Sequence, residues 1–140
     1  MSAVLAQRAG FTPAPGPEQM AAAGLRAFAG IAEAWGLSVD EQLALLGQPP
    51  RSTFFAWRKQ PEKAALSRDT LERLSNLLGI YKSLQILLPD VAAADGWVRQ
   101  PNRAAPFGGG SALQRMLAGN VSDLNFVRRY LDGVRGGGWS

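Results

Sequence analysis

Residues 40–59 read DEQLALLGQPPRSTFFAWRK, two apolar-patterned segments separated by the turn sequence GQPP. Ser38 and the glutamate three residues after it have the spacing of a capping box, so a short helix is predicted to begin there. Gly47 ends this helix, because glycine readily adopts the left-handed conformation of a helix C-terminus. We expect a second short helix with Ser52 as its N-cap, which ends before Pro61.

Two short helices around a glycine-containing turn match a helix-turn-helix, which places its second helix in the major groove of DNA. Helix pairs joined by short turns also occur in other all-α domains, so the motif alone leaves both interpretations open. Phe54 and Trp57 stand three residues apart on the second helix, and we assign both to the core. Phe55 falls between the two faces and has no assigned place. The predicted DNA contacts are Arg51, Ser52 and Thr53, for base edges or phosphates, and Arg58 and Lys59, for phosphates.

The charge distribution favours a polyanionic partner. The chain has 15 basic and 11 acidic residues, a formal net charge of +4. Seven basic and three acidic residues lie between Arg51 and Lys82, and the rest of the chain has eight of each. A surplus confined to one segment suits DNA, although a solvated basic face would give the same pattern.

The remaining N-terminal sequence has helical periodicity and no strand pattern, which predicts an all-α fold. Residues 1–16 are rich in turn formers and are expected to form a flexible arm. A first helix is predicted over Pro17–Trp35. Ser67 caps a helix over residues 68–79, and residues 80–88 are expected to form another. Four leucines of the former are predicted to face inward: Leu71, Leu74, Leu77 and Leu78.

The pattern changes after Pro89. Residues 89–110 hold prolines and glycines and at most one turn of helix, and Trp97 with Phe107 could clamp this connection to the last helices. Ser111 begins a capping box for a short helix, and Ser122 is predicted to cap the last helix. The apolar face expected on that helix consists of Leu124, Val127, Leu131 and Val134.

Composition excludes several classes of chemistry. The chain has no cysteine and no histidine, which rules out disulfides, thiolate or imidazole metal ligands, and catalysis through either side chain. The carboxylates are scattered, so an enzyme acting through carboxylates or Ser/Lys is disfavoured. No stretch is long and apolar enough for a membrane span or a secretory signal. We therefore predict a cytoplasmic protein with no catalytic residue, metal, cofactor or membrane contact.

Four stretches carry a family resemblance: TFFAWRK (53–59), LERLSNLLGIYKSLQILLPD (71–90), GWVRQPNRAAPFGGGSALQRML (96–117) and VRRYLDGVRGGGW (127–139). Over about residues 20–139, the chain resembles antitoxins of the Xre/MbcA/ParS family. The resemblance implies an Xre-like helix-turn-helix bundle over residues 17–88, followed by a small helical toxin-binding domain over residues 89–140 with a flexible C-terminal tail.

For function, the resemblance implies an antitoxin of a bacterial type II toxin-antitoxin system. Its partner would be a RES-domain toxin that consumes NAD, or a related ADP-ribosylating toxin, whose NAD pocket the antitoxin's C-terminal region would cover. The antitoxin would also bind operator DNA of its own operon and repress it, as a homodimer or a larger assembly with toxin. The alternative is a stand-alone helix-turn-helix regulator whose C-terminal half serves dimerisation or ligand binding.

The predicted toxin contacts lie at the C-terminal end. Arg128, Arg129 and Arg135 are candidates for pairing with toxin carboxylates. The terminal sequence RGGGWS supplies Gly136, Gly137, Gly138 and Trp139, which we expect to enter or cover the toxin's pocket. In the alternative, Trp139 folds back on its own domain.

Overall fold

The structure, a computed structural model, describes residues 16–104 and 106–136. These residues form α-helices and 3-10 helices and no β-strand, which confirms the all-α prediction. In chain order the elements are α2 (Pro17–Trp35), α3 (Val39–Leu45), α4 (Arg51–Lys59), η1 (Pro61–Lys63), α5 (Arg68–Leu87), α6 (Val91–Gly96), η2 (Trp97–Arg99), α7 (Ala112–Met116) and α8 (Val121–Arg135).

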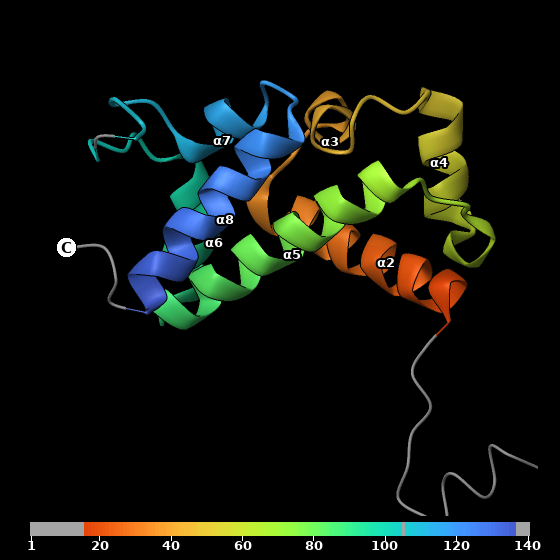
Figure 1. The fold of residues 1–140 in the computed structure, drawn as a ribbon, viewed down its shortest axis with the longest axis horizontal. Coiled ribbons are helices and arrows are strands. Elements are labelled where there is room, and N and C mark those ends of the chain that lie inside the picture. The colour runs from red at the N-terminus through yellow and green to blue at the C-terminus, as the bar shows by residue number, and fades with distance from the viewer. Residues whose placement is uncertain (1–15, 105, 137–140) are drawn as a thin grey trace, which may run out of the picture.

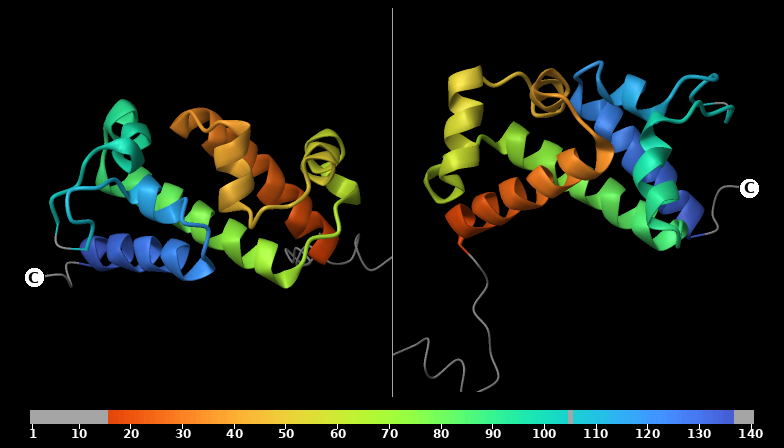
Figure 2. Two further views of the ribbon diagram at one scale, coloured as in Figure 1. Left: turned by 90° about the horizontal axis from the view of Figure 1, so that it is seen from above. Right: turned by 180° about the vertical axis from the view of Figure 1, so that it is seen from behind.

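The long helix α5 crosses the middle of the molecule and contacts both α2 and α8 (Figure 1). α2 packs against α5, α8 lies alongside α5, and α4 stands at the opposite end of the molecule from the last turn of α8 (Figures 1 and 2). α8 runs parallel to α5, because Arg128 contacts Ser75 and Arg135, further along α8, contacts Ser83. One hydrophobic core extends from α2 to α8, so α5 contributes to both halves of the chain. The division at residue 88 stays a prediction.

Local sequence signals set the ends of α2 and the start of α3. Pro17 occupies the first turn of α2, and Gly36 ends it in the left-handed conformation, φ 63°, as predicted. In the capping box of α3, the Glu41 N–H donates to Ser38 Oγ (3.1 Å) and the Ser38 N–H donates to Glu41 Oε1 (2.9 Å). These interactions satisfy helix-end groups within three or four residues, which is why sequence alone revealed them.

Helix α5 differs from the prediction of two helices. It runs unbroken through Gly79, because a continuous buried stripe that includes Leu77 and Ile80 packs along its whole length. Gly79 has a packing role instead: a Cβ there would lie 2.5 Å from Nε of Arg128 on α8. The prediction that Leu71 faces inward was wrong, because this residue lies outside the buried stripe and is 38% exposed.

Two predicted helix caps and one core position were also wrong. Helix α4 begins at Arg51, because Pro50 in an extended conformation (φ −56°, ψ 143°) precedes it, so Ser52 lies inside the first turn. Helix α8 begins at Val121 with Asn120 at its N-cap position, so Ser122 is not the cap. Val134 is 40% exposed because it lies on the last turn of α8, beyond the buried residues of that helix.

The turn between α3 and α4 depends on a buried arginine. Gly47 and Gln48 both have positive φ, 88° and 62°. Arg73 of α5 packs under this turn, where its Nε donates to Asp69 Oδ2 (2.8 Å) and its Nη1 to the Leu45 carbonyl (3.5 Å). Glycine suits position 47 because of its positive φ, and a Cβ there would also lie 3.0 Å from Arg73 Nε, so a larger residue would have to displace the Arg73 side chain. Arg73 therefore belongs to the scaffold that fixes α4, although it counts in the basic surplus.

Candidate functional site

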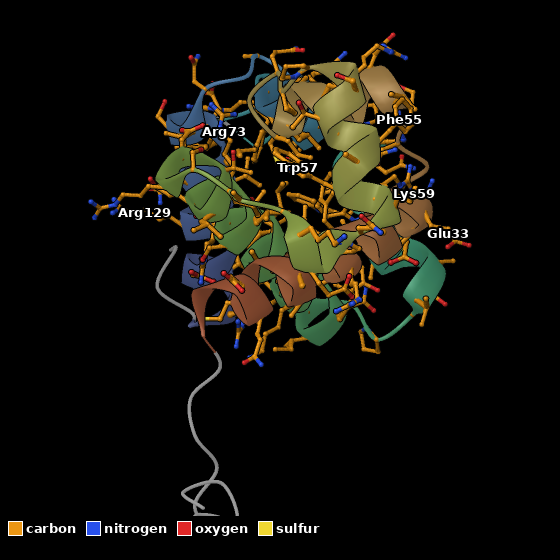
Figure 3. The ribbon with its side chains drawn as sticks, turned by 90° about the vertical axis from the view of Figure 1, so that its right-hand side faces the viewer. Glu33, Phe55, Trp57, Lys59, Arg73 and Arg129 are labelled. Carbon is orange, nitrogen blue, oxygen red and sulfur yellow. The ribbon has the colours of Figure 1, made fainter. Side chains whose placement is uncertain are left out.

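Helix α4 presents one face to the core and the other to solvent. Phe54 is 3% exposed and Trp57 packs partly buried against the core, as the sequence predicted for both. In Figure 3, Trp57 points into the molecule, whereas Phe55 and Lys59 point away from it. The outward face of α4 therefore forms an accessible surface at one end of the molecule.

Four of the five predicted DNA contacts are exposed on α4, namely Arg51, Ser52, Arg58 and Lys59, whereas Thr53 is half-buried. Arg51 Nη1 donates to Asp40 Oδ1 of α3 (2.7 Å). Both side chains of this ion pair are mostly exposed, and such pairs contribute about 0–1 kcal/mol. Arg51 can therefore exchange Asp40 for a phosphate or a base edge at little cost.

Arg58 follows Arg51 by seven residues, so it lies on nearly the same side of α4, closer to the core than Phe55 and Lys59. It stands four residues after Phe54, and its guanidinium carbon lies 5.6 Å from the centroid of the Phe54 ring. The side chain is exposed, but this position is at the edge of the helix next to the core. Arg58 is thus suited to a flanking phosphate rather than to a base.

Phe55 is the α4 residue that the sequence interpretation left without a place. It is 46% exposed and lies between Ser52 and Lys59, at the helical spacings of three and four residues. That spacing was the available signal: with Phe54 and Trp57 inward, position 55 falls on the opposite side of a helix. The outward face, called here the α4 face, consists of Arg51, Ser52, Phe55 and Lys59.

The second candidate surface lies on α8, where two of the three predicted arginines have partners inside the chain. Arg128 Nη1 donates to the carbonyl and the Oγ of Ser75 (3.1 and 3.2 Å). Arg135 Nη1 donates to Ser83 Oγ (3.3 Å), and this hydroxyl donates to Asp132 Oδ1 (3.2 Å). Both arginines therefore hold α8 against α5.

Arg129 is the predicted toxin contact with the freest side chain. It is exposed, extends away from the helix in Figure 3, and has no hydrogen bond or ion pair within the described part of the chain. Gly136 is exposed and ends α8. Gly137, Gly138 and Trp139 lie outside the described residues. The toxin-contact assignments all stay predictions.

Aromatic rings anchor the connection before α7. Trp97 and Phe107 meet edge to face with centroids 6.2 Å apart, which confirms the predicted clamp. Phe107 also contacts the rings of Phe126 and Tyr130 on α8, at 6.2 and 5.2 Å. Edge-to-face ring pairs favour one relative orientation, so they fix this irregular segment on α8.

One arginine joins the two halves of the chain. Arg99 of η2 donates to the carbonyls of Trp35 and Gly36 (2.9 and 2.8 Å) and to Oε1 of Glu41 (2.8 Å). The hydrogen bond from the Ser38 N–H, together with Arg99, holds the pKa of the Glu41 carboxyl below its ordinary value of 4.5, although partial burial acts the other way. The contact links the helix-turn-helix to the segment that follows α5.

The lowered pKa of Glu41 predicts an acid-dependent loss of stability. Because the folded-state pKa lies below 4.5, the stabilisation is complete above about pH 4.5 and is lost as pH falls through the folded-state value. We expect Glu41→Gln to lower the free energy of unfolding by about 1 kcal/mol at pH 7. Between pH 5 and pH 3, the free energy of unfolding should fall less in this variant than in wild type. Urea unfolding across this pH range is the measurement. The matched control is Glu72→Gln at an exposed site on α5, and an equal acid response in Glu41→Gln and wild type would contradict the prediction.

Within residues 16–104 and 106–136, no group of carboxylates could hold a metal ion, and no helix is long and apolar enough to cross a membrane.

The fold and the α4 face define the chain as a helix-turn-helix protein with an additional helical unit. Residues 15–79 match the family model of the antitoxin Xre-like helix-turn-helix domain, and residues 83–137 that of the antitoxin Xre/MbcA/ParS C-terminal toxin-binding domain. The uncharacterized protein y4oB of Sinorhizobium fredii (strain NBRC 101917 / NGR234) is 51% identical over 113 residues, which cover 81% of this chain and 84% of that protein. The chain belongs to the Xre/MbcA/ParS family of antitoxins, and is thus a toxin-antitoxin component with a helix-turn-helix and a toxin-binding domain.

Proposed function

We propose that this antitoxin represses its own operon by placing α4 in the major groove of operator DNA. The observation that carries the proposal is the α4 face, where two exposed basic side chains, Arg51 and Lys59, flank the middle of an outward helix. Basic side chains on such a helix neutralise phosphates, and its polar residues reach base edges. Arg58 and the half-buried Thr53 flank this contact.

For the partner, we propose a RES-domain toxin that consumes NAD, or a related ADP-ribosylating toxin. The match of residues 83–137 to a toxin-binding domain supports a toxin partner, and the resemblance described above supports its class. The antitoxin would cover the NAD pocket with α8 and the residues after it, with Arg129 pairing with toxin carboxylates. α8 ends at the opposite end of the molecule from α4, so toxin and DNA would not compete for one surface (Figure 1).

The proposed assembly is a homodimer or a larger complex with toxin. Helix-turn-helix proteins commonly read two half-sites about 34–36 Å apart, and a dimer supplies two recognition helices at that spacing. Because bacterial DNA lies in the cytoplasm, a protein that binds the operator of its own operon would act there, and we place the protein in the bacterial cytoplasm.

Co-expression with the protein encoded by the adjacent gene tests this function. Expression of that neighbour alone is expected to lower cellular NAD and stop growth, and co-expression of the full antitoxin is expected to restore both. The two proteins should co-purify. If the neighbour is harmless and the chain still binds its promoter, the chain is a stand-alone transcriptional regulator instead.

A further inference from the structure

Phe55 is exposed in a part of α4 where an apolar side chain has no role in the core. It is the only aromatic side chain among the large exposed hydrophobic residues of the described segments, at 46%. The adjacent Phe54 is 3% exposed and already fills the core position of this turn. Phe55 therefore leaves nearly half of its surface open to solvent.

The ring has a defined position. Phe55 meets the Phe54 ring edge to face, with centroids 5.3 Å apart and planes at 68°. Because Phe54 is fixed in the core, this contact limits the orientations of Phe55 before any partner binds. A preorganised side chain loses less conformational entropy on binding.

The neighbours of Phe55 indicate the kind of partner. Arg51 precedes it by four residues and Lys59 follows it by four, so a cation stands on either side of the ring along one helix face. This arrangement matches a helix in the major groove, where flanking cations reach phosphates and the central side chain reaches base edges. The main apolar group on the floor of that groove is the 5-methyl group of thymine.

We propose that Phe55 reads sequence by packing its ring against the 5-methyl group of a thymine in each operator half-site. This inference rests on the proposed binding of α4 to DNA. Phe55 then discriminates among operators, whereas Arg51 and Lys59 contribute affinity. The same contact would accept 5-methylcytosine, which carries a methyl group at the equivalent place in the groove.

The experiment begins with selection of preferred sites from random duplex DNA by the full-length protein. The selected half-site is expected to contain a thymine that becomes unspecified when selection is repeated with Phe55→Ala. Replacing that thymine by deoxyuridine removes only the methyl group and should weaken wild-type binding about fourfold, the effect of withdrawing one buried methyl group. For Phe55→Ala the same replacement should change affinity less than 1.5-fold.

Two further variants make the test specific. Phe55→Leu keeps an apolar side chain and should retain part of the response to deoxyuridine. Ser52→Ala, on the same face, should leave that response unchanged even if overall affinity falls. Circular dichroism and size-exclusion chromatography of each variant test whether the fold and the oligomeric state are unaltered.

The outcomes separate this inference from the function on which it rests. If the wild-type protein selects no sequence and binds no DNA, the proposed operator binding fails and the inference falls with it. If wild type binds DNA but Phe55→Ala keeps the same half-site and the same response to deoxyuridine, only the inference is overturned. It is also overturned if Phe55→Ala keeps its sequence preference but changes the oligomeric state, because the ring would then contact protein.

Discussion

Replacing Arg51 and Lys59 together by alanine is expected to weaken operator binding on the order of 10- to 100-fold at moderate salt. Both side chains are exposed on the α4 face, and the Asp40 partner of Arg51 holds it only weakly. Each lost phosphate contact should also lower the slope of log affinity against log salt by about one unit. Fluorescence anisotropy of labelled promoter DNA over a series of salt concentrations measures both quantities.

The matched control is Lys82→Ala combined with Arg129→Ala. This pair removes the same two charges from exposed positions on α5 and α8, away from α4. Because general electrostatic attraction depends on net charge, whereas phosphate contacts depend on position, the control should lose affinity less than threefold. Equal losses for the two double variants would contradict the assignment of α4 as the recognition helix.

Removing residues 136–140 is expected to abolish inhibition of the toxin while the two proteins still form a complex. This deletion removes Trp139 and the glycines but keeps α8, whose buried face packs on α5. If Trp139 fills the toxin's pocket, the single change Trp139→Ala should already weaken inhibition at least about 30-fold, as for other buried tryptophan anchors. The measurements are NAD consumption by the toxin and affinity for the antitoxin, made with the same preparations.

Deletion of Ser140 alone is the control, because it shortens the chain and keeps Trp139. It should inhibit like the full chain. Unchanged inhibition by the 136–140 deletion would refute the pocket model. A lower melting temperature of the free deletion variant would support the alternative in which Trp139 folds back on its own domain.

The accuracy of the sequence predictions depended on how far along the chain each signal reached. The Pro17–Trp35 helix was predicted to the residue, and the capping boxes at Ser38 and Ser111 also formed as expected. In each, the decisive hydrogen bonds join residues at most five apart. The cap at Ser52 failed because Pro50 had already imposed the extended conformation that precedes a helix.

The candidate functional residues also fall into two groups: those that helical periodicity places correctly, and those whose surroundings depend on partners far away in the sequence. The sequence indicated correctly that Phe54 and Trp57 face inward, so the outward side of α4 could be deduced from helical periodicity. It could not distinguish a free cation from one with a partner elsewhere in the fold. Arg73 lies buried under the α3–α4 turn, and Arg128 lies against Gly79, far away in sequence.

By itself, the sequence determined the helical class, the ends of several helices and the inward side of α4, because these follow from bonds and periodicities within one or two turns. Only the tertiary structure decided that α5 is a single helix, that Arg99 joins the two halves and that Arg73 is buried under the α3–α4 turn. Those properties depend on which helix packs against which. Such contacts join residues up to 64 positions apart, and no local pattern encodes them.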